Sequence, residues 1–316
     1  MTIWRPISAE DSDRLAELDA ACRATDGDDP ISDALPAALA GVKDIAWNTL
    51  GAETSAGKLV AAGWVDPSGK LGITTAGKVH PDFRRQGLGN RLLEWAECRA
   101  IELLQSGNSS QLVITNEALS EGAQRLYLAR DYTLGMEEEM RVGDLTRPFP
   151  GGGFPEGINL ASWSPDTAIQ FYQAYCHSFQ DRPGFPFPSA DDWINGNNEF
   201  DGFRPTLSVL ARYSEEPVGF LTADVYSGLG WISQVGVVPA WRRKGLAKAL
   251  MIEALHRFSN EGFTQAALHV NVNNLAAINL YASLGFPVRL KRARFVKEIK
   301  APSNPDPFKK ENKRSR

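Results

Sequence analysis

The stretch that decides the fold runs Val235-Gly236-Val237-Val238-Pro239-Ala240-Trp241-Arg242-Arg243-Lys244-Gly245-Leu246-Ala247. An apolar run typical of a β-strand ends at Pro239, and an amphipathic helix is expected to begin near Gly245. Free N–H groups and the helix dipole at such a helix start favour an anion, and glycine lets a ligand come close to the backbone. With three basic residues directly before Gly245, the stretch predicts a pyrophosphate site that needs no metal ion.

The same stretch occurs a second time, as Val79-His80-Pro81-Asp82-Phe83-Arg84-Arg85-Gln86-Gly87-Leu88-Gly89. Pro81 and Pro239 are 158 positions apart, and so are Gly87 and Gly245. One glycine turn is weak evidence because such turns are common. Two copies in register, each between an apolar run and a helical pattern, indicate a tandem repeat.

A second motif follows each copy of the turn. In the second half it is Asn274-Leu275-Ala276-Ala277-Ile278-Asn279-Leu280-Tyr281-Ala282-Ser283-Leu284-Gly285-Phe286. The first half carries a degenerate copy, Ser120-Glu121-Gly122-Ala123-Gln124-Arg125-Leu126-Tyr127-Leu128-Ala129-Arg130-Asp131-Tyr132. The turn pattern Arg-x-x-Gly-x-Gly/Ala and the pattern Asn-x-x-Ala-x-x-Leu-Tyr-x-x-x-Gly-Phe together resemble those of the GNAT N-acetyltransferases. The resemblance covers nearly the whole chain and points to a tandem member of that family.

The resemblance implies an α/β (α+β) fold with two GNAT domains, each a mixed, mostly antiparallel sheet flanked by helices. We expect an N-terminal domain at residues 1–145 and a C-terminal domain at residues 158–300. Residues 146–157 are rich in proline and glycine and are expected to form the linker. A strand at 132–142 would close the first domain, and a strand at 287–298 would close the second.

The resemblance also implies which residues bind acetyl-CoA. The pyrophosphate would lie against the turn amides, and the pantetheine arm would enter where the strand of Val237 splays from the strand near Val270. A backbone N–H near Val237 would stabilise the oxyanion that develops on the thioester carbonyl. The residues expected to bind the cofactor are Val237, Val238, Arg242, Arg243, Lys244, Gly245, Leu246, Ala247, Lys248 and Asn274 in the second half, and Val79, Arg84, Arg85, Gln86, Gly87, Leu88 and Gly89 in the first.

Two residues of the second motif have alternative interpretations. Tyr281 matches the family's general acid, which protonates the leaving thiolate, but a tyrosine packed on the core face of its helix is the alternative. Asn274 matches a position that contacts the cofactor arm. It could instead, or in addition, be the N-cap of its helix.

The general base is not identified by the sequence. Several members of the family carry a glutamate where this chain has Trp231, and the matching position of the first half is Ile73. The remaining candidates are Asp224, His269, and a water held by Ser233 or Gln234. An ordinary carboxylate near a turn and a core histidine are the alternative interpretations of Asp224 and His269.

The first half keeps its turn and Tyr127, but Ser120 replaces the asparagine of the motif and Asp131 replaces the glycine. We expect this half to bind acyl-CoA, or to retain a vestige of that site, with the chemistry in the second half. No nucleophilic cysteine or serine lies in a motif, so direct acetyl transfer to an amine within a ternary complex is expected. The alternative is a non-catalytic acyl-CoA-binding protein with the same fold.

An aromatic segment at residues 180–203 follows the first helix of the second half. Its side chains would either line a pocket for a small amine or fill the space between the two domains. The aromatic residues are Phe185, Phe187, Trp193, Phe200 and Phe203.

Composition sets the remaining expectations. The net charge of −4 gives no reason to expect nucleic acid, and the 3 cysteines lack metal or disulfide spacing. The N-terminus does not resemble a signal peptide, and there is no apolar run of about 18 residues. We therefore expect a cytoplasmic protein, a monomer or homodimer, that acts on a small-molecule amine and binds no membrane. The basic tail at 301–316 is expected to be disordered.

Overall fold

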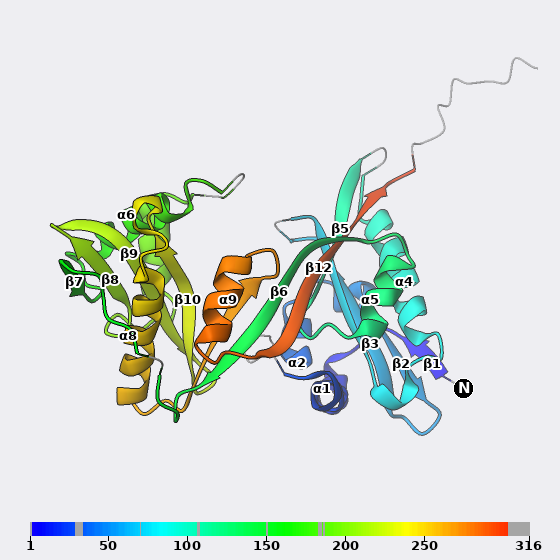
Figure 1. The fold of residues 1–316 in the computed structure, drawn as a ribbon. Helices are drawn as coiled ribbons and strands as arrows, with labels where there is room; N and C mark the ends of the chain where they lie inside the picture. The colour runs from blue at the N-terminus through cyan, green and yellow to red at the C-terminus, as the bar shows by residue number, and fades with distance from the viewer. Residues whose placement is uncertain are drawn as a thin grey trace, which may run out of the picture. The chain divides into compact units, whose positions relative to one another are not determined.

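The computed structural model describes residues 2–302, except for residues 29–33, 70, 106–107, 150, 183–184 and 186. The chain forms two compact units. Unit 1 combines the chain up to Glu137 with the segment from Leu290 onward, and unit 2 is Glu138–Arg289 (Figure 1). The tail expected to be disordered lies, from residue 303, outside the described residues.

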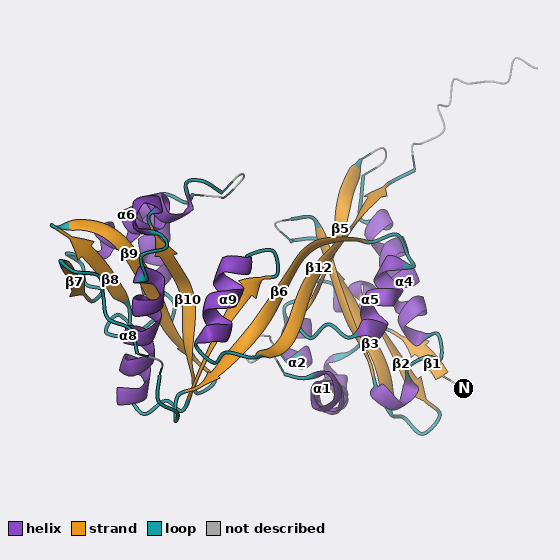
Figure 2. Cartoon of the chain, in the orientation of Figure 1, coloured by secondary structure: helices purple, strands orange, loops and turns teal. Residues whose placement is uncertain are grey.

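Unit 1 is built on a sheet with the strand order β1-β2-β3-β4-β5-β12 (Figure 2). The pairing is antiparallel except between β4 and β5, which run parallel. The strands are β1 (Thr2–Arg5), β2 (Thr49–Thr54), β3 (Leu59–Asp66), β4 (Ile73–Val79), β5 (Ser109–Asn116) and β12 (Val288–Lys300).

Helices cover both faces of this sheet. Neighbouring residues of β3 point to opposite faces, as alternation requires: Ala62 packs in the cluster of α1 and α2, whereas Ala61 packs in the cluster of α4. Figure 1 shows α4 and α5 on one side of the sheet and α1 and α2 on the other. The helices are α1 (Ser12–Asp26), α2 (Leu35–Ala40), α3 (Ile45–Asn48), α4 (Leu88–Glu102) and α5 (Glu121–Leu128), with short 3-10 turns at Ala9–Asp11 and Pro81–Phe83.

Unit 2 repeats the plan with the strand order β6-β11-β10-β9-β8-β7, in which only β10 and β11 are parallel. Phe220 of β9 packs in the cluster of α6 and α7, and the next residue, Leu221, packs in the cluster of α8. The elements are β6 (Thr133–Asp144), β7 (Ile158–Ala161), α6 (Ala168–Phe179), α7 (Ala190–Asn198), β8 (Val209–Tyr213), β9 (Glu216–Tyr226), β10 (Leu229–Val237), α8 (Leu246–Asn260), β11 (Gln265–Asn271) and α9 (Leu275–Ser283), with a 3-10 turn at Pro239–Trp241. The predicted fold class, mixed and mostly antiparallel sheets flanked by helices, is confirmed.

The closing strands are exchanged between the halves, which the sequence analysis did not predict. β6 was expected to close the first domain, but it pairs with β11 of unit 2, where Val142 is the partner of Ala267. β12 was expected to close the second domain, but it pairs with β5 of unit 1, where Phe295 is the partner of Ile114. An alternating apolar pattern identifies a strand but not its partner, because either sheet edge can bury the same face.

The expected domain limits therefore differ from the compact units. The segment expected to be a linker also belongs to unit 2, because Phe149 and Phe154 pack against its two clusters on the α8 side. Among the described residues, no helix is both long and apolar enough to cross a membrane.

Candidate functional site

The two glycine turns have the same backbone conformation. Arg85 and Arg243 both adopt positive φ, at 64° and 60°. Gly87 and Gly245 follow at φ 82° and 83°, each with ψ −5°. This left-handed conformation is the one that glycine adopts without strain, which explains why the glycine is repeated.

Both turns leave the start of a long helix open. Neither Gly87 nor Gly245 has a side-chain cap, and neither helix has an acidic residue in its first turn. The first helical hydrogen bonds are accepted by the carbonyls of these glycines, from Arg91 and Ala249, so the preceding N–H groups have no helical acceptor. A Cβ added at either glycine would meet nothing within 4 Å. The turn thus has room beside its glycine, and its unpaired helix-start amides have the polarity that an anion requires.

Next to each turn, two parallel strands separate. β4 and β5 pair only through Ile73, Thr74 and Thr75, although β4 continues to Val79. β10 and β11 pair only through Gly230 and Trp231, although β10 continues to Val237. The splay predicted for the second half is therefore confirmed, and the first half has it too.

The backbone direction in the splayed segments also agrees with the prediction. Val238 donates its N–H to the carbonyl of Val218 on the β9 side, at 3.1 Å. Successive N–H groups of a strand point to opposite sides, so the N–H of Val237 points toward the gap. In unit 1 the backbone N–H of His80 donates to the carbonyl of Val60 at 2.9 Å, so the N–H of Val79 likewise points toward the gap between the splayed strands. The amide of Val238, a predicted cofactor contact, is used within the sheet.

The first arginine of each motif braces the protein. Arg84 donates from Nε to the carbonyl of Val79 at 3.0 Å and forms a two-point ion pair with Asp26 at the end of α1, at 2.7 and 2.6 Å. Arg242 likewise donates to the carbonyl of Val237 at 3.2 Å and pairs with Asp181. Both guanidinium groups are thus engaged by carbonyl and carboxylate groups of the protein, and contact of Arg84 and Arg242 with the cofactor stays a prediction.

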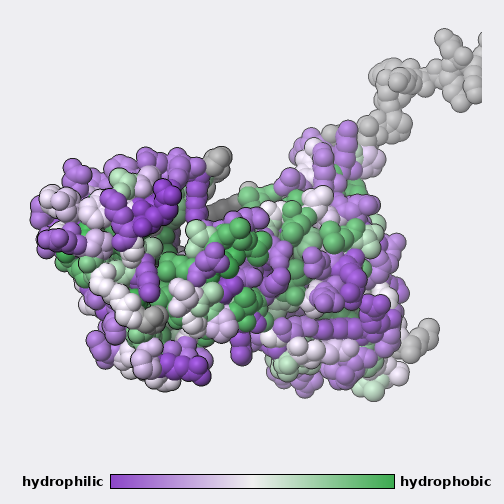
Figure 3. All heavy atoms as spheres, in the orientation of Figure 1, coloured by the Kyte–Doolittle hydropathy of each residue, from purple (hydrophilic) through white to green (hydrophobic). Residues whose placement is uncertain are grey.

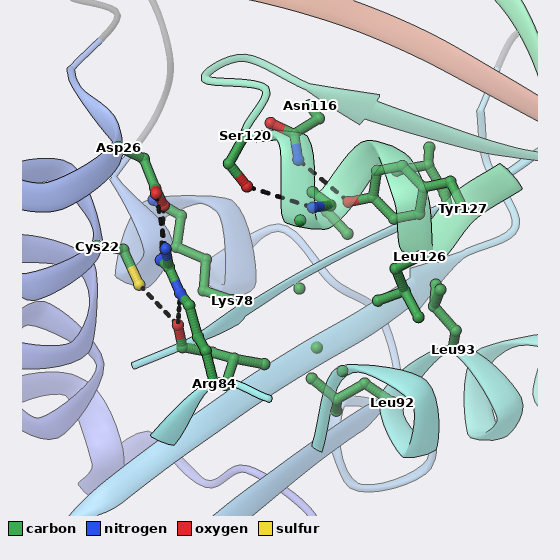
Figure 4. Close-up of a pocket in the computed structure, with 18 of the residues that line it drawn as sticks. Cys22, Asp26, Lys78, Arg84, Leu92, Leu93, Asn116, Ser120, Leu126 and Tyr127 are labelled. Carbon is green, nitrogen blue, oxygen red and sulfur yellow. Dashed lines mark hydrogen bonds and ion pairs between the residues drawn. The ribbon is translucent and has the colours of Figure 1, made fainter. Parts of the chain in front are cut away.

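Unit 1 contains a cavity of about 890 Å³ between its splayed strands. Figure 4 shows Cys22, Asp26 and Arg84 on one side of it and Asn116, Ser120 and Tyr127 on the other. Among the predicted residues, its lining includes Val79, Arg84, Arg85, Gly87, Leu88 and Gly89. The cavity therefore joins the turn to the tyrosine of the second motif, as a site for a long thioester requires.

The two motif tyrosines differ in their hydroxyl contacts. Tyr127 accepts a hydrogen bond from the amide of Asn116 at 3.1 Å. The hydroxyl of Tyr281 has no hydrogen-bond partner among the described residues, although the side chain is only 6% exposed. Burial raises the pKa of Tyr281 to about 12, partly offset by the charge of Arg182, so the phenol keeps its proton at neutral pH. The other side of α9 exposes apolar residues beside Asn279 and Ser283, with Leu275 67% exposed, and hydrophobic side chains gather over this helix in Figure 3.

The degenerate motif of the first half keeps the geometry of the second. Asn274 accepts from the N–H of Ala277 at 3.3 Å, so its predicted alternative role as an N-cap is confirmed. Ser120 caps α5 in the same way. Asp131 has φ 63°, which matches the left-handed Gly285. Serine can cap a helix and aspartate tolerates this conformation, so these replacements leave the backbone intact.

The position of the family's glutamate offers no carboxylate in either unit. Trp231 is 7% exposed and meets the ring of His269 edge-on at 5.1 Å. Ile73 is buried in the core of unit 1. Asp224, on the neighbouring strand β9, accepts a hydrogen bond from Ser233.

The aromatic segment mostly builds the core of unit 2. Trp193 lies on α7, which the sequence analysis did not predict, and stacks on Tyr175 of α6 at 5.0 Å. Phe203 is buried in the same cluster, whereas Phe187 and Phe200 are 45% and 43% exposed. Trp193 and Phe203 pack in the core of unit 2. A role of this segment in lining an amine pocket stays a prediction.

Cys22 is poorly suited to act as an acyl-enzyme nucleophile. Cys22 borders the unit 1 cavity, but burial raises the pKa of its thiol and it donates to the carbonyl of Val79. Among the described residues, no group of three or more His, Cys, Asp or Glu side chains is placed to hold a metal ion.

Comparison with known proteins assigns the family. The sequence model described as the acetyltransferase (GNAT) family matches residues 169–286, and the one described as the acetyltransferase (GNAT) domain matches residues 48–134. The mycothiol acetyltransferase of Thermobispora bispora is 30% identical over 228 residues, which are 70% of this chain and 72% of that protein.

Solved structures agree over the full length. A GCN5-related N-acetyltransferase from Sphaerobacter thermophilus is 27% identical with a TM-score of 0.74, and the match covers 95% of this chain and 96% of that one. A tandem GNAT protein from the clavulanic acid biosynthesis pathway shares the fold, with a TM-score of 0.64 at 16% identity over 96% of this chain and 100% of that one. With both turns, both splayed gaps and both motif tyrosines in place, the chain belongs to the GNAT family of N-acetyltransferases, as a member with two such domains in tandem.

Proposed function

We propose that the protein transfers an acetyl group from acetyl-CoA to the amine of a small molecule, with both substrates bound together in unit 2. The observation that carries this proposal is the gap between β10 and β11 beyond Trp231, which has the open Gly245 turn at one end. Tyr281 lies on the helix that follows β11 and packs in the same cluster as Val270. Its hydroxyl has no hydrogen-bond partner in the part of the chain that the structure describes, which supports a role in chemistry rather than in folding.

Bound acetyl-CoA would supply an acetyl group activated as a thioester. The N–H of Val237 would bind the carbonyl oxygen as negative charge develops on it. The phenol of Tyr281 would give its proton to the departing sulfur. The amides that would hold the pyrophosphate are those of Arg243, Lys244, Gly245, Leu246, Ala247 and Lys248, with the ammonium of Lys244 nearby over the ring of Trp241 at 4.8 Å.

For unit 1 we propose acyl-CoA binding without catalysis. Its cavity, its Gly87 turn and the inward N–H of Val79 support binding. Two carboxylates of unit 1 are already engaged in ion pairs, Asp19 with Lys78 and Asp26 with Arg84, which argues against amine activation there. The non-catalytic alternative weighed for the whole chain thus describes this unit.

The acceptor is best sought through the named relative. A cysteinyl pseudodisaccharide is the first amine to test, because the tandem layout matches that of mycothiol acetyltransferases. A panel of glucosamine, S-methyl-L-cysteine and spermidine covers other amine classes. S-methylation keeps the acceptor from reacting with the thiol reagent that reports coenzyme release, and mass spectrometry detects the product of thiol-bearing acceptors.

The experiment uses matched substitutions at the two glycines. Gly245→Asp places a carboxylate where phosphate would bind, and Gly245→Asn is its neutral control, since both residues tolerate left-handed φ. At the effective dielectric of a protein surface, a like charge about 4 Å from phosphate costs about 4 kcal/mol, so Gly245→Asp should weaken acetyl-CoA binding more than tenfold and stop turnover. Gly245→Asn should keep most of both.

The matching substitutions in unit 1, Gly87→Asp and Gly87→Asn, show which of the two sites carries out the reaction. Calorimetry should count two equivalents of acetyl-CoA per chain in the parent protein and one in Gly87→Asp, with turnover preserved. Turnover that survives Gly245→Asp but is lost in Gly87→Asp would place the chemistry in unit 1. A parent protein that binds acetyl-CoA and acetylates none of the amines would refute the proposed activity.

A further inference from the structure

The position of the missing glutamate has a carboxylate opposite it on the neighbouring strand. Trp231 of β10 and Asp224 of β9 are Cα partners in an antiparallel pair. Side chains at such a pair lie on the same face, with their Cβ atoms about 5 Å apart. This face is the one that α6 and α7 cover, because Phe220, four residues before Asp224, packs in their cluster. The side chain of Asp224 therefore begins within one side-chain length of the Cβ atom at position 231, where the family's glutamate would stand.

A break in strand register directs a hydroxyl toward Asp224. The pairing of β9 and β10 shifts between Ile232 and Gln234, which leaves Ser233 as the extra residue of a bulge. Ser233 is exposed and donates from Oγ to the carboxylate of Asp224. The bulge therefore holds the carboxylate by one oxygen and leaves the other able to accept a proton.

The same face carries two polar atoms without partners. Thr222 and Gln234 are Cα partners on β9 and β10, next to the bulge. Thr222 Oγ1 and Gln234 Oε1 are buried and have no hydrogen-bond partner among the described residues, and Thr222 is 0% exposed. Leaving such groups unpaired costs about 1–3 kcal/mol each, so a polar ligand on this face would be stabilised by them.

We propose that Asp224 is the general base of unit 2, which takes a proton from the ammonium group of the acceptor. This inference rests on the proposed function. The ammonium gives one proton to the free oxygen of the Asp224 carboxylate and becomes a neutral amine. After transfer, the carboxyl returns that proton to water. When the nitrogen forms the amide bond and the thioester C–S bond breaks, the nitrogen loses a second proton. This proton restores the one that Tyr281 gives to the departing sulfur.

The surroundings of Asp224 suit this role. Burial raises the pKa of its carboxyl above the ordinary value, and the Ser233 hydroxyl and the charge of Arg204 offset part of that rise. A raised pKa brings a base closer to neutral pH, where proton transfer is most effective. Further titratable side chains on this face are His269, which meets Trp231 edge-on at 5.1 Å, and Tyr172, Tyr175 and Cys176 of α6, which pack in the cluster that contains Phe220.

Unit 1 provides a matched control. Asp66 occupies the position in β3 that Asp224 occupies in β9, 158 residues later. There the strands pair without a bulge, and Asp66 accepts from the N–H and the hydroxyl of Ser68 at 2.9 and 2.7 Å. Its carboxylate is thus used in a turn.

The kinetic test compares Asp224→Asn with Asp66→Asn, using the amine of the panel that the parent protein acetylates fastest. Loss of a general base should lower kcat/KM of Asp224→Asn about 100-fold or more at pH 7. The deficit should shrink as pH rises, because more of the amine is then already neutral. Ser233→Ala should move the acidic limb of the pH profile upward and keep the plateau, since it removes a hydrogen bond that lowers the pKa of Asp224. Asp66→Asn should match the parent protein.

A binding measurement on protein without acetyl-CoA provides a second readout. Calorimetry should show that Asp224→Asn weakens the cationic amine about tenfold and leaves its neutral N-acetylated product unchanged, because only the amine carries the charge that Asp224 attracts. Asp224→Asn with parental kcat/KM and parental amine affinity would overturn this inference alone. Failure of the parent protein to acetylate any amine would overturn the proposed function and this inference with it.

Discussion

Arg84 and Asp26 form a two-point ion pair, with Nη1–Oδ1 at 2.7 Å and Nη2–Oδ2 at 2.6 Å. The pair ties the end of α1 to the strand end at Val79, whose carbonyl accepts from Nε of the same guanidinium. The arginine of the turn motif therefore shapes the site through the protein's own groups.

The change in acetyl-CoA affinity caused by Asp26→Asn distinguishes two roles of Arg84, a structural brace and a direct phosphate ligand. If Arg84 is a brace, Arg84→Gln and Asp26→Asn should weaken acetyl-CoA binding at unit 1 by similar factors, and the double variant should add little. If Arg84 held phosphate directly, Asp26→Asn would free the guanidinium and strengthen binding. These variants are compared by calorimetry of acetyl-CoA binding in protein that also carries Gly245→Asp, so that only the unit 1 site is measured. Both single variants should also lower the stability of unit 1 by about 1 kcal/mol, since the pair is partly exposed.

Removing the hydroxyl of each motif tyrosine should have opposite consequences. Tyr281→Phe should reduce kcat about 10- to 100-fold with an unchanged melting temperature, because its hydroxyl has no partner to lose among the described residues. Tyr127→Phe should keep kcat but cost about 1 kcal/mol, since it removes the hydrogen bond from Asn116. The measurements are steady-state kinetics and thermal unfolding. A reversal of the two outcomes would move the chemistry to unit 1.

The exchanged strands predict which fragments fold. Residues 138–289 contain every strand of the unit 2 sheet except the first part of β6, and should unfold cooperatively in urea. Residues 1–145 lack β12, which buries Ala293 and Phe295 in the core of unit 1, and should fold poorly. A synthetic peptide of residues 288–300 should restore their cooperative unfolding. If residues 1–145 fold cooperatively without the peptide, β12 is not needed for the core of unit 1.

Asp11 predicts how the stability of unit 1 depends on pH. Its carboxylate accepts two hydrogen bonds from Arg5, at 2.7 and 2.6 Å, which hold its pKa at about 2. Because this pKa is below the ordinary value near 4, the stabilisation is complete above pH 4 and is lost as pH falls through 2. Asp11→Asn should therefore cost about 2 kcal/mol at pH 7, and progressively less between pH 4 and pH 2. Urea unfolding of both proteins at pH 7, 4 and 3 checks this slope.

The features that depend on nearby residues could be predicted from the sequence. The turn conformation at Gly87 and Gly245 depends on a few neighbouring backbone angles, so a repeated glycine was enough to identify it. The cap at Asn274 depends on an amide three residues away. The apparent loss of the motif in the first half, at Asp131, did not change the backbone, because aspartate can adopt the conformation of the glycine it replaces.

The features that depend on distant partners could not be predicted. The carboxylates that engage Arg84 and Arg242 lie 58 and 61 residues earlier in the chain, so the motif alone suggested ligand contacts. The hydrogen bond from Ser233 to Asp224 depends on the bulge at Ser233, which has no sequence signature in a strand of this composition. The partners of β6 and β12 are a property of the folded chain, because both strands fit either sheet edge.

The exchanged strand β12 has a consequence for synthesis on the ribosome. Domains of a multidomain chain commonly fold in the order in which they emerge, from the N-terminus. Here the last strand of unit 1, β12 (Val288–Lys300), is synthesised after residues 138–287 of unit 2. The second unit can therefore finish folding before the first, although synthesis of the first unit begins earlier.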